Sequence, residues 1–381
     1  MKRVGILGGG QLGLLLAHAV RNLGGRPRFY DPDPEAPAAR QFADTVTAAW
    51  TDEAALARFA GDCDVLTYEF ENIVTSGLRA LASLPPVLPS LDALETAQHR
   101  LREKQFLERT GLPRVEFRAA RTIEELREAL SAFGYPAIVK TAGGGYDGKG
   151  QRFVRDEREL QAIAPSASGW VIEEPIALAC EVSCIVARAP GGEERVFPVL
   201  ENLHEHHILD RTLVPARISP ALAAQAREAA LEAARALDVR GLLTVEFFVG
   251  RSARAPEREL FVNELAPRPH NSGHVTLRAC TFSQFDALAR ILLDVPVGEP
   301  RLAGPGAYCM GNLLGDVWLA QGREQLELAA WADHPRVLDV TLYGKRGARE
   351  RRKMGHFIVR ADSADEALDE ALAFRRALAK K

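Results

Sequence analysis

Two apolar segments of this chain each carry a glutamate, and this pair constrains the fold more than any other feature. Residues 244–249 surround Glu246 with apolar side chains, and Glu264 follows the apolar start of residues 261–272. The apolar neighbours predict two buried strands, in which a carboxylate is costly unless a cation meets it. We therefore expect a sheet that brings both carboxylates to one site.

A divalent metal ion is the partner that two such carboxylates favour. Mg²⁺ prefers one or two carboxylates together with phosphate oxygens and water, so Glu246 and Glu264 suit a magnesium–nucleotide complex, with Mn²⁺ as the alternative ion. Arg268 and His270 follow in the same segment and add a guanidinium and an imidazole that are typical of an oxyanion site. The alternative is a structural role, in which each glutamate pairs with a nearby arginine.

The composition is that of a globular enzyme of two or three domains. The 381 residues are 47% hydrophobic, and a net charge of −3 lacks the basic excess that nucleic-acid binding requires. The five cysteines form no CxxC pair, which argues against a disulfide framework or a cysteine zinc site and favours the cytoplasm. Three glycines, Gln11 and His18 interrupt the apolar N-terminal run, which argues against a signal peptide. No apolar stretch reaches the ~20 residues of a membrane helix. Since the basic excess is also lacking, we expect small-molecule partners.

Residues 1–95 alternate strands and helices as a Rossmann-like domain does. The expected elements are a strand, a helix and two further strands, at 4–7, 12–23, 27–30 and 62–70. The turn Gly8-Gly-Gly-Gln-Leu-Gly13 satisfies GxGxxG and precedes Asp31 by about 20 residues, which favours an NAD-dependent oxidoreductase. The same backbone shape also binds other phosphates or polar ligands at a helix N-terminus. We expect the ligand where this turn, Asp31 and residues 69–72 converge.

Three further regions follow along the chain. They are a small unit over 96–175, a larger α+β unit over 176–300 and a β-rich segment over 301–381. The expected helices are 93–110, 123–133, 220–237 and one from 364, and the expected strands besides the two acidic ones are 136–140, 181–187, 337–343 and 356–360. The first of these helices carries Arg100 and Lys104 on one face.

A second glycine-rich loop is typical of a mobile lid over phosphates. Residues 140–151 contain five glycines between Lys140, at the end of an apolar strand, and Gln151, with Lys149 inside the loop. Glycine allows the backbone to approach a triphosphate closely, and lysine neutralises its charge. No GK[ST] closes the loop, so it is not a Walker A motif, and the alternative is a solvated linker.

Two more polar patterns suggest nucleotide contacts. Glu173 ends an apolar run at a break in the chain, and Glu181 follows with the spacing of carboxylates that bind a ribose. His204, His206 and His207 form a cluster, but no further Cys or His completes a tetrahedral zinc site. We predict that His204 donates to a phosphate and that the other two histidines lie at the surface.

With these motifs in order, the whole chain resembles the ATP-grasp superfamily, and within it the N5-carboxyaminoimidazole ribonucleotide synthetases of purine biosynthesis. The matching motifs are Gly8–Gly13, Tyr68-Glu-Phe-Glu-Asn72, Gly145-Tyr-Asp-Gly-Lys-Gly-Gln151, Asn202-Leu-His204, Asn263-Glu-Leu-Ala-Pro-Arg-Pro-His-Asn-Ser-Gly-His274 and Arg352-Lys-Met-Gly-His356. The resemblance implies an α/β ATP-grasp fold with an N-terminal Rossmann-like (pre-ATP-grasp) domain, a small β-rich C-terminal part, and a homodimer.

The resemblance also implies a set of ligand contacts. Mg²⁺ would be held by Glu246 and Glu264, and ATP by Arg100, Lys140, Gly145, Tyr146, Asp147, Gly148, Lys149, Gly150, Gln151, Glu173, Glu174, Pro175, Ile176, Glu181, His204, Asn263 and Glu264. The ribonucleotide would contact Gly10, Gln11, Leu12, Glu71, Asn72, Asn271, Ser272, Lys345, Arg352 and Lys353. The catalytic residues would be Arg268, His270, Tyr146, Asp147 and Lys149.

Within that assignment each group has an expected task. Arg268 and His270 clamp bicarbonate and carboxyphosphate, since a guanidinium fork fits a planar carboxylate. Gln11, Glu71 and Tyr146 orient the imidazole, and Lys345 with Arg352 or Lys353 holds the 5′-phosphate. A loop closing around Tyr146 and Asp147 shields the labile carbamate.

The implied reaction is the ATP- and bicarbonate-dependent carboxylation of 5-aminoimidazole ribonucleotide. The chain has Glu264-Leu-Ala-Pro-Arg268 where many ATP-grasp enzymes have Glu-x-Asn-x-Arg, which disfavours biotin carboxylase, and Lys149 stands where some relatives have arginine. Three alternatives stay open. They are an NAD-dependent oxidoreductase, a noncatalytic nucleotide sensor, and a formate-dependent glycinamide ribonucleotide transformylase, which residues 68–72 disfavour.

Overall fold

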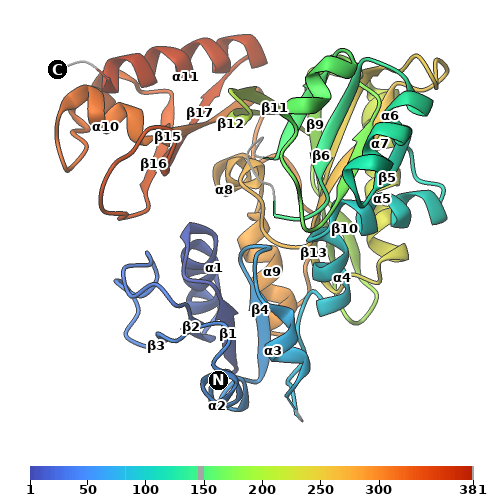
Figure 1. The fold of residues 1–381 in the computed structure, drawn as a ribbon. Coiled ribbons are helices and arrows are strands. Elements are labelled where there is room, and N and C mark those ends of the chain that lie inside the picture. The colour runs from blue at the N-terminus through green and yellow to red at the C-terminus, as the bar shows by residue number, and fades with distance from the viewer. Residues whose placement is uncertain (82, 145–149, 380–381) are drawn as a thin grey trace.

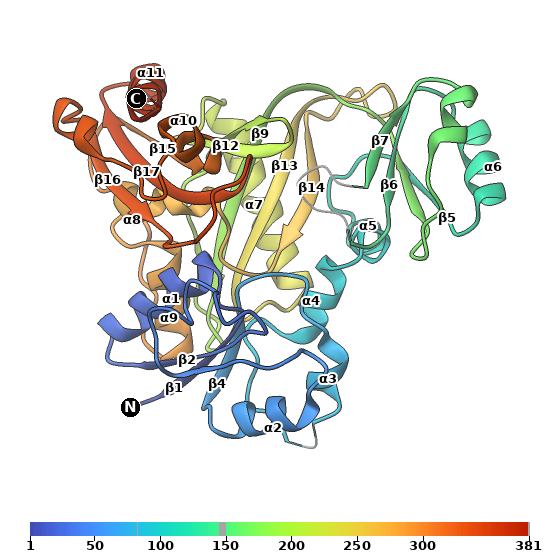
Figure 2. The same ribbon diagram turned by 60° about the vertical axis from the view of Figure 1, so that its left-hand side comes forward.

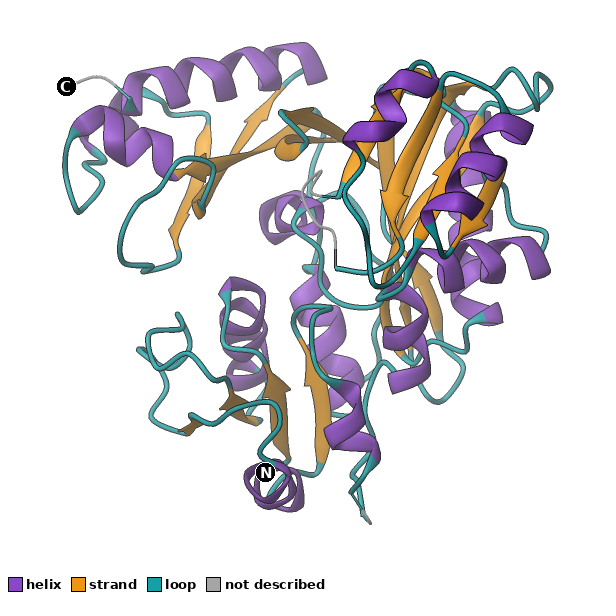
Figure 3. Ribbon diagram, in the orientation of Figure 1, coloured by secondary structure: helices purple, strands orange, loops and turns teal. Residues whose placement is uncertain are grey.

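The structure is a computed structural model that describes residues 1–81, 83–144 and 150–379 (Figure 1). These residues form a mixed α/β protein with three sheets, which confirms the predicted fold class (Figure 3). The first sheet belongs to the N-terminal unit, the second to a small unit, and the third runs through the rest of the molecule.

The N-terminal sheet is parallel, in the order β3-β2-β1-β4. Its strands are β1 (Arg3–Leu7), β2 (Arg26–Tyr30), β3 (Thr45–Val46) and β4 (Val65–Tyr68), with helices α1 (Gln11–Asn22), α2 (Glu53–Gly61) and α3 (Thr75–Arg79). Every residue of β1 and β4 except Arg3 is buried, as is usual for parallel strands covered on both faces. The glycine turn therefore meets residues 69–72 at the ends of β1 and β4, as predicted.

The small unit is an antiparallel sheet in the order β5-β8-β6-β7, which Figure 2 shows at one side of the molecule. Its elements are β5 (Phe117–Ala120), α6 (Ile123–Phe133), β6 (Ala137–Thr141), β7 (Gln151–Val154), η1 (Glu157–Ala162) and β8 (Trp170–Glu173). Helix α6 begins at the N-cap Thr122, whose side chain accepts from the Glu125 amide, and it buries Leu126, Leu130 and Phe133.

The single helix predicted over 93–110 is wrong, because the chain forms two helices, α4 (Leu91–Ala97) and α5 (Arg100–Arg109). His99 between them is extended. Gln98 Nε2 donates to the Glu71 carbonyl at 2.5 Å, and the Arg100 amide donates to the Ala142 carbonyl at 2.8 Å. The second contact takes the Arg100 amide away from the helical pattern, and neither contact can be predicted from the local sequence.

The large sheet has the order β14-β13-β9-β11-β12-β15-β17-β16, with β10 paired to β9. Its strands are β9 (Ala177–Arg188), β10 (Glu194–Val196), β11 (Leu200–Glu205), β12 (Ile208–Val214), β13 (Gly241–Arg251), β14 (Leu260–Ala266), β15 (Ala307–Leu314), β16 (Val337–Leu342) and β17 (Lys353–Ala361). Its helices are α7 (Pro220–Ala236), η2 (Ser272–Val275), α8 (Thr276–Ala279), α9 (Gln284–Leu292), α10 (Gly315–Gln321), η3 (Ala329–Asp333) and α11 (Ala364–Leu378). Because β12 pairs with β15, the C-terminal strands continue this sheet.

Packing of α1 against α9 fixes the N-terminal unit to the large sheet. Leu16 and Val20 of α1 share a buried cluster with Leu288 and Leu292 of α9, and all four are at most 1% exposed. Truncating one such leucine to alanine typically costs about 2–5 kcal/mol. The glycine turn at the start of α1 therefore has a fixed position relative to β13 and β14, which carry the two predicted glutamates.

Candidate functional site

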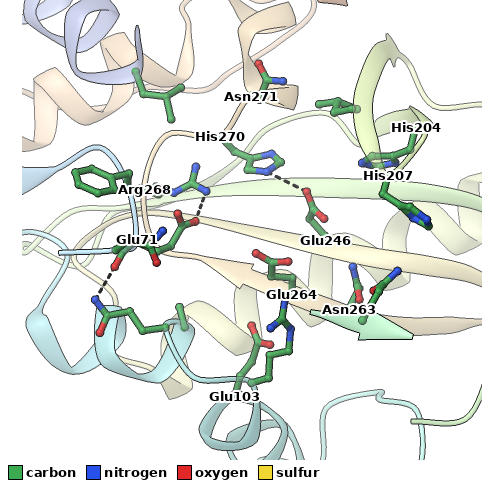
Figure 4. Close-up of a pocket in the computed structure, with 18 of the residues that line it drawn as sticks. Glu71, Glu103, His204, His207, Glu246, Asn263, Glu264, Arg268, His270 and Asn271 are labelled. Carbon is green, nitrogen blue, oxygen red and sulfur yellow. Dashed lines mark hydrogen bonds and ion pairs between the residues drawn. The ribbon is translucent and has the colours of Figure 1, made fainter. Parts of the chain in front are cut away.

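A cavity of about 700 Å³ lies where the three sheets meet, and it gathers residues from all regions of the chain. Its volume is in the range of small-molecule sites. Among the residues predicted for the site, those that line it are Gln11, Leu12, Glu71, Asn72, Arg100, Lys140, Gln151, Glu173, Glu181, His204, Glu246, Asn263, Glu264, Arg268, His270, Asn271, Lys345, Arg352 and Lys353. Figure 4 shows the centre of this cavity.

Other predicted site residues lie outside this lining. Gly10, Gly150, Glu174, Pro175, Ile176 and Ser272 do not line the cavity, and Gly145, Tyr146, Asp147, Gly148 and Lys149 lie outside the described residues. The carboxylate of Glu174 accepts from Ser252 Oγ at 2.8 Å and from the Arg254 amide at 2.9 Å, so it anchors the neighbouring loop. Ser272 is fully buried behind His270.

Glu246 and Glu264 face each other across neighbouring strands, as the sequence predicted. They are register partners of β13 and β14, and the register shifts immediately after Glu246. The next pair is Phe247 with Val262, so Asn263 is the extra residue of a bulge. The bulge lets Asn263 and Glu264 both line the cavity, although adjacent strand residues ordinarily point to opposite faces.

The electrostatics of this pair fit a cation. His270 Nε2 lies 3.0 Å from Glu246 Oε1 (Figure 4). Burial acts to raise the pKa of Glu246, but His270, His204 and Arg268 outweigh it and lower that pKa. Glu264 projects into the cavity, where the surrounding protein and the charges of Glu246 and Glu71 raise its pKa. Because like charges disfavour double ionisation, a bound cation would relieve this repulsion.

Arg268 lies beside the acidic pair and is itself held by a carboxylate. Its guanidinium forms an ion pair with Glu71 and donates to the Pro269 carbonyl at 2.8 Å. Glu71 comes from the loop after β4, so this contact joins the N-terminal unit to the segment after β14 (Figure 4). Arg268 and His270 therefore reach the same cavity, as predicted. Arg268 contacts Glu71 there, and His270 contacts Glu246.

The opposite wall presents lysines. Buried Glu173 lies between two ammonium groups, with Lys140 Nζ at 2.6 Å and Lys104 Nζ at 3.4 Å. Burial acts to raise the pKa of Glu173, but the two lysines lower it to about 2. Two cations around one carboxylate leave a net positive charge on this wall, which suits a phosphate.

Sequence reasoning omitted Lys104 and Glu103 from the site. The available signal for Lys104 was its position one turn after Arg100 on the predicted helix. Glu103 Oε1 accepts from the Leu265 amide at 2.6 Å, and burial, with Glu264 adding to it and Lys104 opposing, raises the pKa of Glu103 to about 8. The contact of Lys104 with Glu173 and that of Glu103 with Leu265 both join residues that are far apart in the chain.

His204 and Glu181 lie on adjacent strands, β11 and β9. His204 Nδ1 is 3.2 Å from Glu181 Oε1. Burial acts to lower the pKa of His204, but Glu181 and then Glu246 outweigh it and raise that pKa. His206 and His207 are exposed, which confirms their predicted surface position, and His207 also reaches the cavity rim.

The N-terminal glycine turn binds carboxylates of the protein itself. The amides of Gly10, Leu12 and Gly13 donate to Glu69 at 2.9–3.1 Å, and the Gly9 amide donates to Asp31 at 2.6 Å. A dinucleotide pyrophosphate would need the same amides and would meet the charge of Glu69. The fingerprint therefore serves the fold here, which argues against an NAD site.

Three basic residues from the C-terminal part of the chain line the cavity. Lys345 Nζ donates to the Lys353 carbonyl at 2.9 Å, and Arg352 donates to the Gly347 carbonyl at 2.8 Å. Burial lowers the pKa of Lys345 to about 8, and Arg352 and Lys353 add to the decrease against the opposing charge of Glu69. This concentration of cations suits a second phosphate.

Three family models match successive parts of the chain. They are a ribonucleotide synthetase preATP-grasp domain over residues 1–98, an ATP-grasp domain over 105–285 and a phosphoribosylaminoimidazole carboxylase C-terminal domain over 309–370. None of the helices among the described residues has both the length and the apolar character needed to cross a membrane.

Curated and solved relatives match along nearly the whole chain. The chain is 35% identical to the N5-carboxyaminoimidazole ribonucleotide synthase of Bacillus subtilis, over 96% of this chain and 93% of that protein. It spans 36% of the length of the bifunctional purine synthesis protein purC/E of Dictyostelium discoideum, to which it is 36% identical.

Two solved structures share the fold closely. An N5-carboxyaminoimidazole ribonucleotide synthetase in complex with ADP has a TM-score of 0.89 and 37% identity, covering 98% of this chain and 96% of that one. The Aspergillus clavatus synthase in complex with ADP and 5-aminoimidazole ribonucleotide has a TM-score of 0.86 and 29% identity, covering 99% and 98%.

Proposed function

We propose that this chain, which belongs to the family of N5-carboxyaminoimidazole ribonucleotide synthases, carboxylates the exocyclic amine of 5-aminoimidazole ribonucleotide with ATP and bicarbonate. The observation that carries the proposal is the single cavity that joins a lysine wall, a carboxylate pair, a guanidinium with an imidazole, and a distant basic cluster. ATP, a divalent cation, bicarbonate and a ribonucleotide phosphate require these four kinds of group.

The chemistry takes two steps. A bicarbonate oxygen attacks the γ-phosphorus of ATP, the bond to the β,γ-bridging oxygen breaks, and ADP leaves with that electron pair. The amine then attacks the carbonyl carbon of carboxyphosphate, or CO₂ released from it, phosphate leaves, and the nitrogen loses a proton. Positioning and electrostatic stabilisation supply the catalysis, because no covalent bond to the protein is needed.

The nucleotide occupies the wall that carries Lys140. Arg100 and Lys140 lie beside the phosphates, and Glu181 and His204 of the large sheet line the same cavity. Glu246 and Glu264 would hold Mg²⁺, and their mutual repulsion supports this assignment. When bound, the ion supplies electrostatic stabilisation of the phosphoryl oxygens.

Arg268 and His270 clamp the bicarbonate. Both groups point into the cavity beside the acidic pair, and a guanidinium fork fits a planar carboxylate (Figure 4). Glu71 holds the plane of Arg268 and, with Gln11, lies near the position proposed for the imidazole. Tyr146, Asp147 and Lys149 are proposed from the sequence alone.

The basic cluster of Lys345, Arg352 and Lys353 binds the 5′-phosphate. The carboxylate of Glu69 already occupies the N-terminus of α1 and repels an anion there, which supports placing the phosphate on the basic cluster and not on the α1 amides. We further propose functional units over 1–95, 96–175, 176–300 and 301–381, a homodimer, and a cytoplasmic location, supported by the chain's composition and its family.

The decisive experiment is ADP release measured with each substrate omitted in turn. We expect ATP cleavage to require bicarbonate and to rise on addition of 5-aminoimidazole ribonucleotide, because both acceptors must occupy one cavity. Glycinamide ribonucleotide with formate should not replace them. Equal turnover with that pair would move the assignment to a transformylase, and ATP binding without any turnover would make the chain a sensor.

A further inference from the structure

A line of buried hydroxyl and amide groups leads from the interior of the large sheet to the ring of His270. Ser272 Oγ lies 2.9 Å from His270 Nδ1 and 3.0 Å from Ser183 Oγ. Asn202 Nδ2 lies 3.0 Å from Ser183 Oγ, and Thr212 Oγ1 lies 3.3 Å from Asn202 Oδ1. None of the four residues behind His270 is more than 5% exposed.

With the Asn202 amide oriented as in the structure, the donors along this line point toward His270. The Thr212 hydroxyl donates to Asn202 Oδ1, which orients the amide so that Nδ2 donates to Ser183 Oγ. The hydrogen of Ser183 is then free to point to Ser272 Oγ, and the hydrogen of Ser272 to His270 Nδ1. Each group in the line thus passes its donor toward the imidazole.

The backbone gives the same direction independently. The Ser272 amide also donates to His270 Nδ1, at 3.4 Å, and an amide N–H requires an acceptor. Nδ1 is therefore the acceptor, and the ring hydrogen that faces the cavity lies on Nε2. That nitrogen is 3.0 Å from Glu246 Oε1, so it donates to the carboxylate.

We propose that Ser272, Ser183, Asn202 and Thr212 are positioning residues that fix the tautomer and ring plane of His270. These four residues, which we call the relay, hold Nε2–H toward the anionic side of the cavity. There Nε2–H donates to Glu246 and, during turnover, to the oxyanion. Partners of this kind orient ligand-binding imidazoles in many sites. The proposed effect on turnover rests on the proposed function, in which His270 binds bicarbonate. The assignment of the tautomer does not depend on that function.

The relay also accounts for two features that the proposed reaction leaves unused. Ser272 was predicted to touch the ribonucleotide, yet it is buried away from the cavity and contacts His270 and Ser183 instead. Asn202 belongs to the motif Asn202-Leu-His204 but its side chain contacts Ser183 and Thr212. Both become necessary if the orientation of His270 must be fixed.

The test combines kinetics with nitrogen-15 spectroscopy of the full chain. Ser272→Ala removes the hydroxyl that contacts Nδ1, and Thr67→Val is the matched control, since Thr67 is a fully buried threonine of β4 outside the relay. Thr212→Val and Thr212→Ser form a second pair that deletes or keeps the hydroxyl at the remote end. The His270 signal is assigned by its loss in His270→Gln.

We expect the free wild-type protein to show His270 as the Nε2–H tautomer. Ser272→Ala should mix the two tautomers and lower kcat about 10- to 100-fold while the Kd of ATP is unchanged. Thr212→Val should act in the same direction and Thr212→Ser should restore it, which decides the matter even if Ser272→Ala fails to fold. Thr67→Val should change neither readout.

An Nδ1–H tautomer or an imidazolium in the wild-type protein would overturn the proposal, as would wild-type kcat and spectra in Ser272→Ala and Thr212→Val. The spectroscopic result needs neither bicarbonate nor a ribonucleotide. If the wild-type protein shows the Nε2–H tautomer but no bicarbonate-dependent ADP release, the proposed function fails and the relay stands.

Discussion

The two walls of the cavity carry opposite balances of charge. On one wall, Lys104 and Lys140 surround the single carboxylate of Glu173. On the other, Glu246 and Glu264 face each other. The first balance attracts an anion and the second a cation, and a magnesium–nucleotide complex presents both at the spacing of one cavity. The charges of both walls together therefore indicate the class of ligand better than the charge of either wall alone.

The same comparison shows that neighbours decide the ionisation of a carboxyl group here. Burial acts to raise the pKa of both Glu173 and Glu264. Two lysines outweigh burial and lower the pKa of Glu173 to about 2, whereas the charges of Glu246 and Glu71 add to burial and raise the pKa of Glu264. Neighbouring charges thus favour the ionised form of Glu173 and disfavour that of Glu264.

The largest expected effect comes from neutralising the acidic wall. Glu246→Gln or Glu264→Gln should lower turnover by about 10³-fold or more, because a metal ion supplies several kcal/mol of charge stabilisation. Folding should be nearly unaffected. ADP release and thermal unfolding are measured together, with the exposed Glu128→Gln as control. Near-normal turnover in either cavity variant would mean that its glutamate has a structural role.

The second-largest expected effect distinguishes a role in binding bicarbonate from a role in binding ATP. Arg268→Lys is expected to suppress bicarbonate-dependent ADP release by about 100-fold or more with ATP affinity nearly unchanged, since lysine keeps the charge but loses the two parallel donors. Calorimetry with ATP and a bicarbonate saturation curve on the same variant test this. Weaker ATP binding with unchanged bicarbonate half-saturation would place Arg268 at the nucleotide.

A smaller effect is expected on the lysine wall. Lys140→Ala should weaken ATP binding by about 2 kcal/mol or more, roughly 30-fold, because the remaining Lys104 and Glu173 leave the wall neutral. Lys104→Met should weaken it for the same reason and by a similar factor, although Lys104 lies deeper. Calorimetry measures both. ATP affinity that changes in Lys140→Ala alone would mean that contact with Lys140, and not the net charge of the wall, controls binding.

Features carried by a single segment could be predicted from the sequence. The two acidic strands, the N-terminal strand–turn–helix and the order of Arg268 after Glu264 follow from apolar runs and motif spacing. Each of these segments contributes residues to the cavity. The resemblance to a known family then supplied the ligands, which no pattern of burial specifies. The NAD fingerprint shows the limit of a motif, because Gly8–Gly13 specifies a backbone shape that Glu69 occupies.

Features that depend on distant contacts could not be predicted. Glu69 reaches the α1 amides from 56 residues or more along the chain, and Glu103 accepts from Leu265, 162 residues away. At the break between α4 and α5, the Arg100 amide donates to the carbonyl of Ala142, and the Gln98 side chain donates to the loop after β4. The bulge at Asn263 is a property of strand pairing, which a single strand does not reveal. Each of these features can be recognised only once the fold has brought the distant segments together.

The smallest expected effect concerns the carboxyl of Glu103, which lies behind the acidic wall. Its pKa is raised from an ordinary 4.5 to about 8, first by burial and further by the charge of Glu264, with Lys104 opposing. Between these two values the folded protein therefore holds one more proton than the unfolded chain. The free energy of unfolding should fall as pH rises through this window, by up to about 1.4 kcal/mol per pH unit.

Glu103→Gln removes this proton while keeping an oxygen that can accept from the Leu265 amide. We expect urea unfolding of the variant at pH 5.5, 6.5 and 7.5 to show a shallower loss of stability than the wild-type protein, so that the variant gains most at the highest pH. The exposed Glu124→Gln serves as control. Identical slopes in the Glu103 variant and the wild-type protein would show that Glu103 is already ionised at neutral pH and paired with Lys104. The lysine wall would then have to be counted as neutral, because Glu103 and Glu173 together would balance Lys104 and Lys140, and its attraction for ATP would have to come from contact geometry instead of net charge.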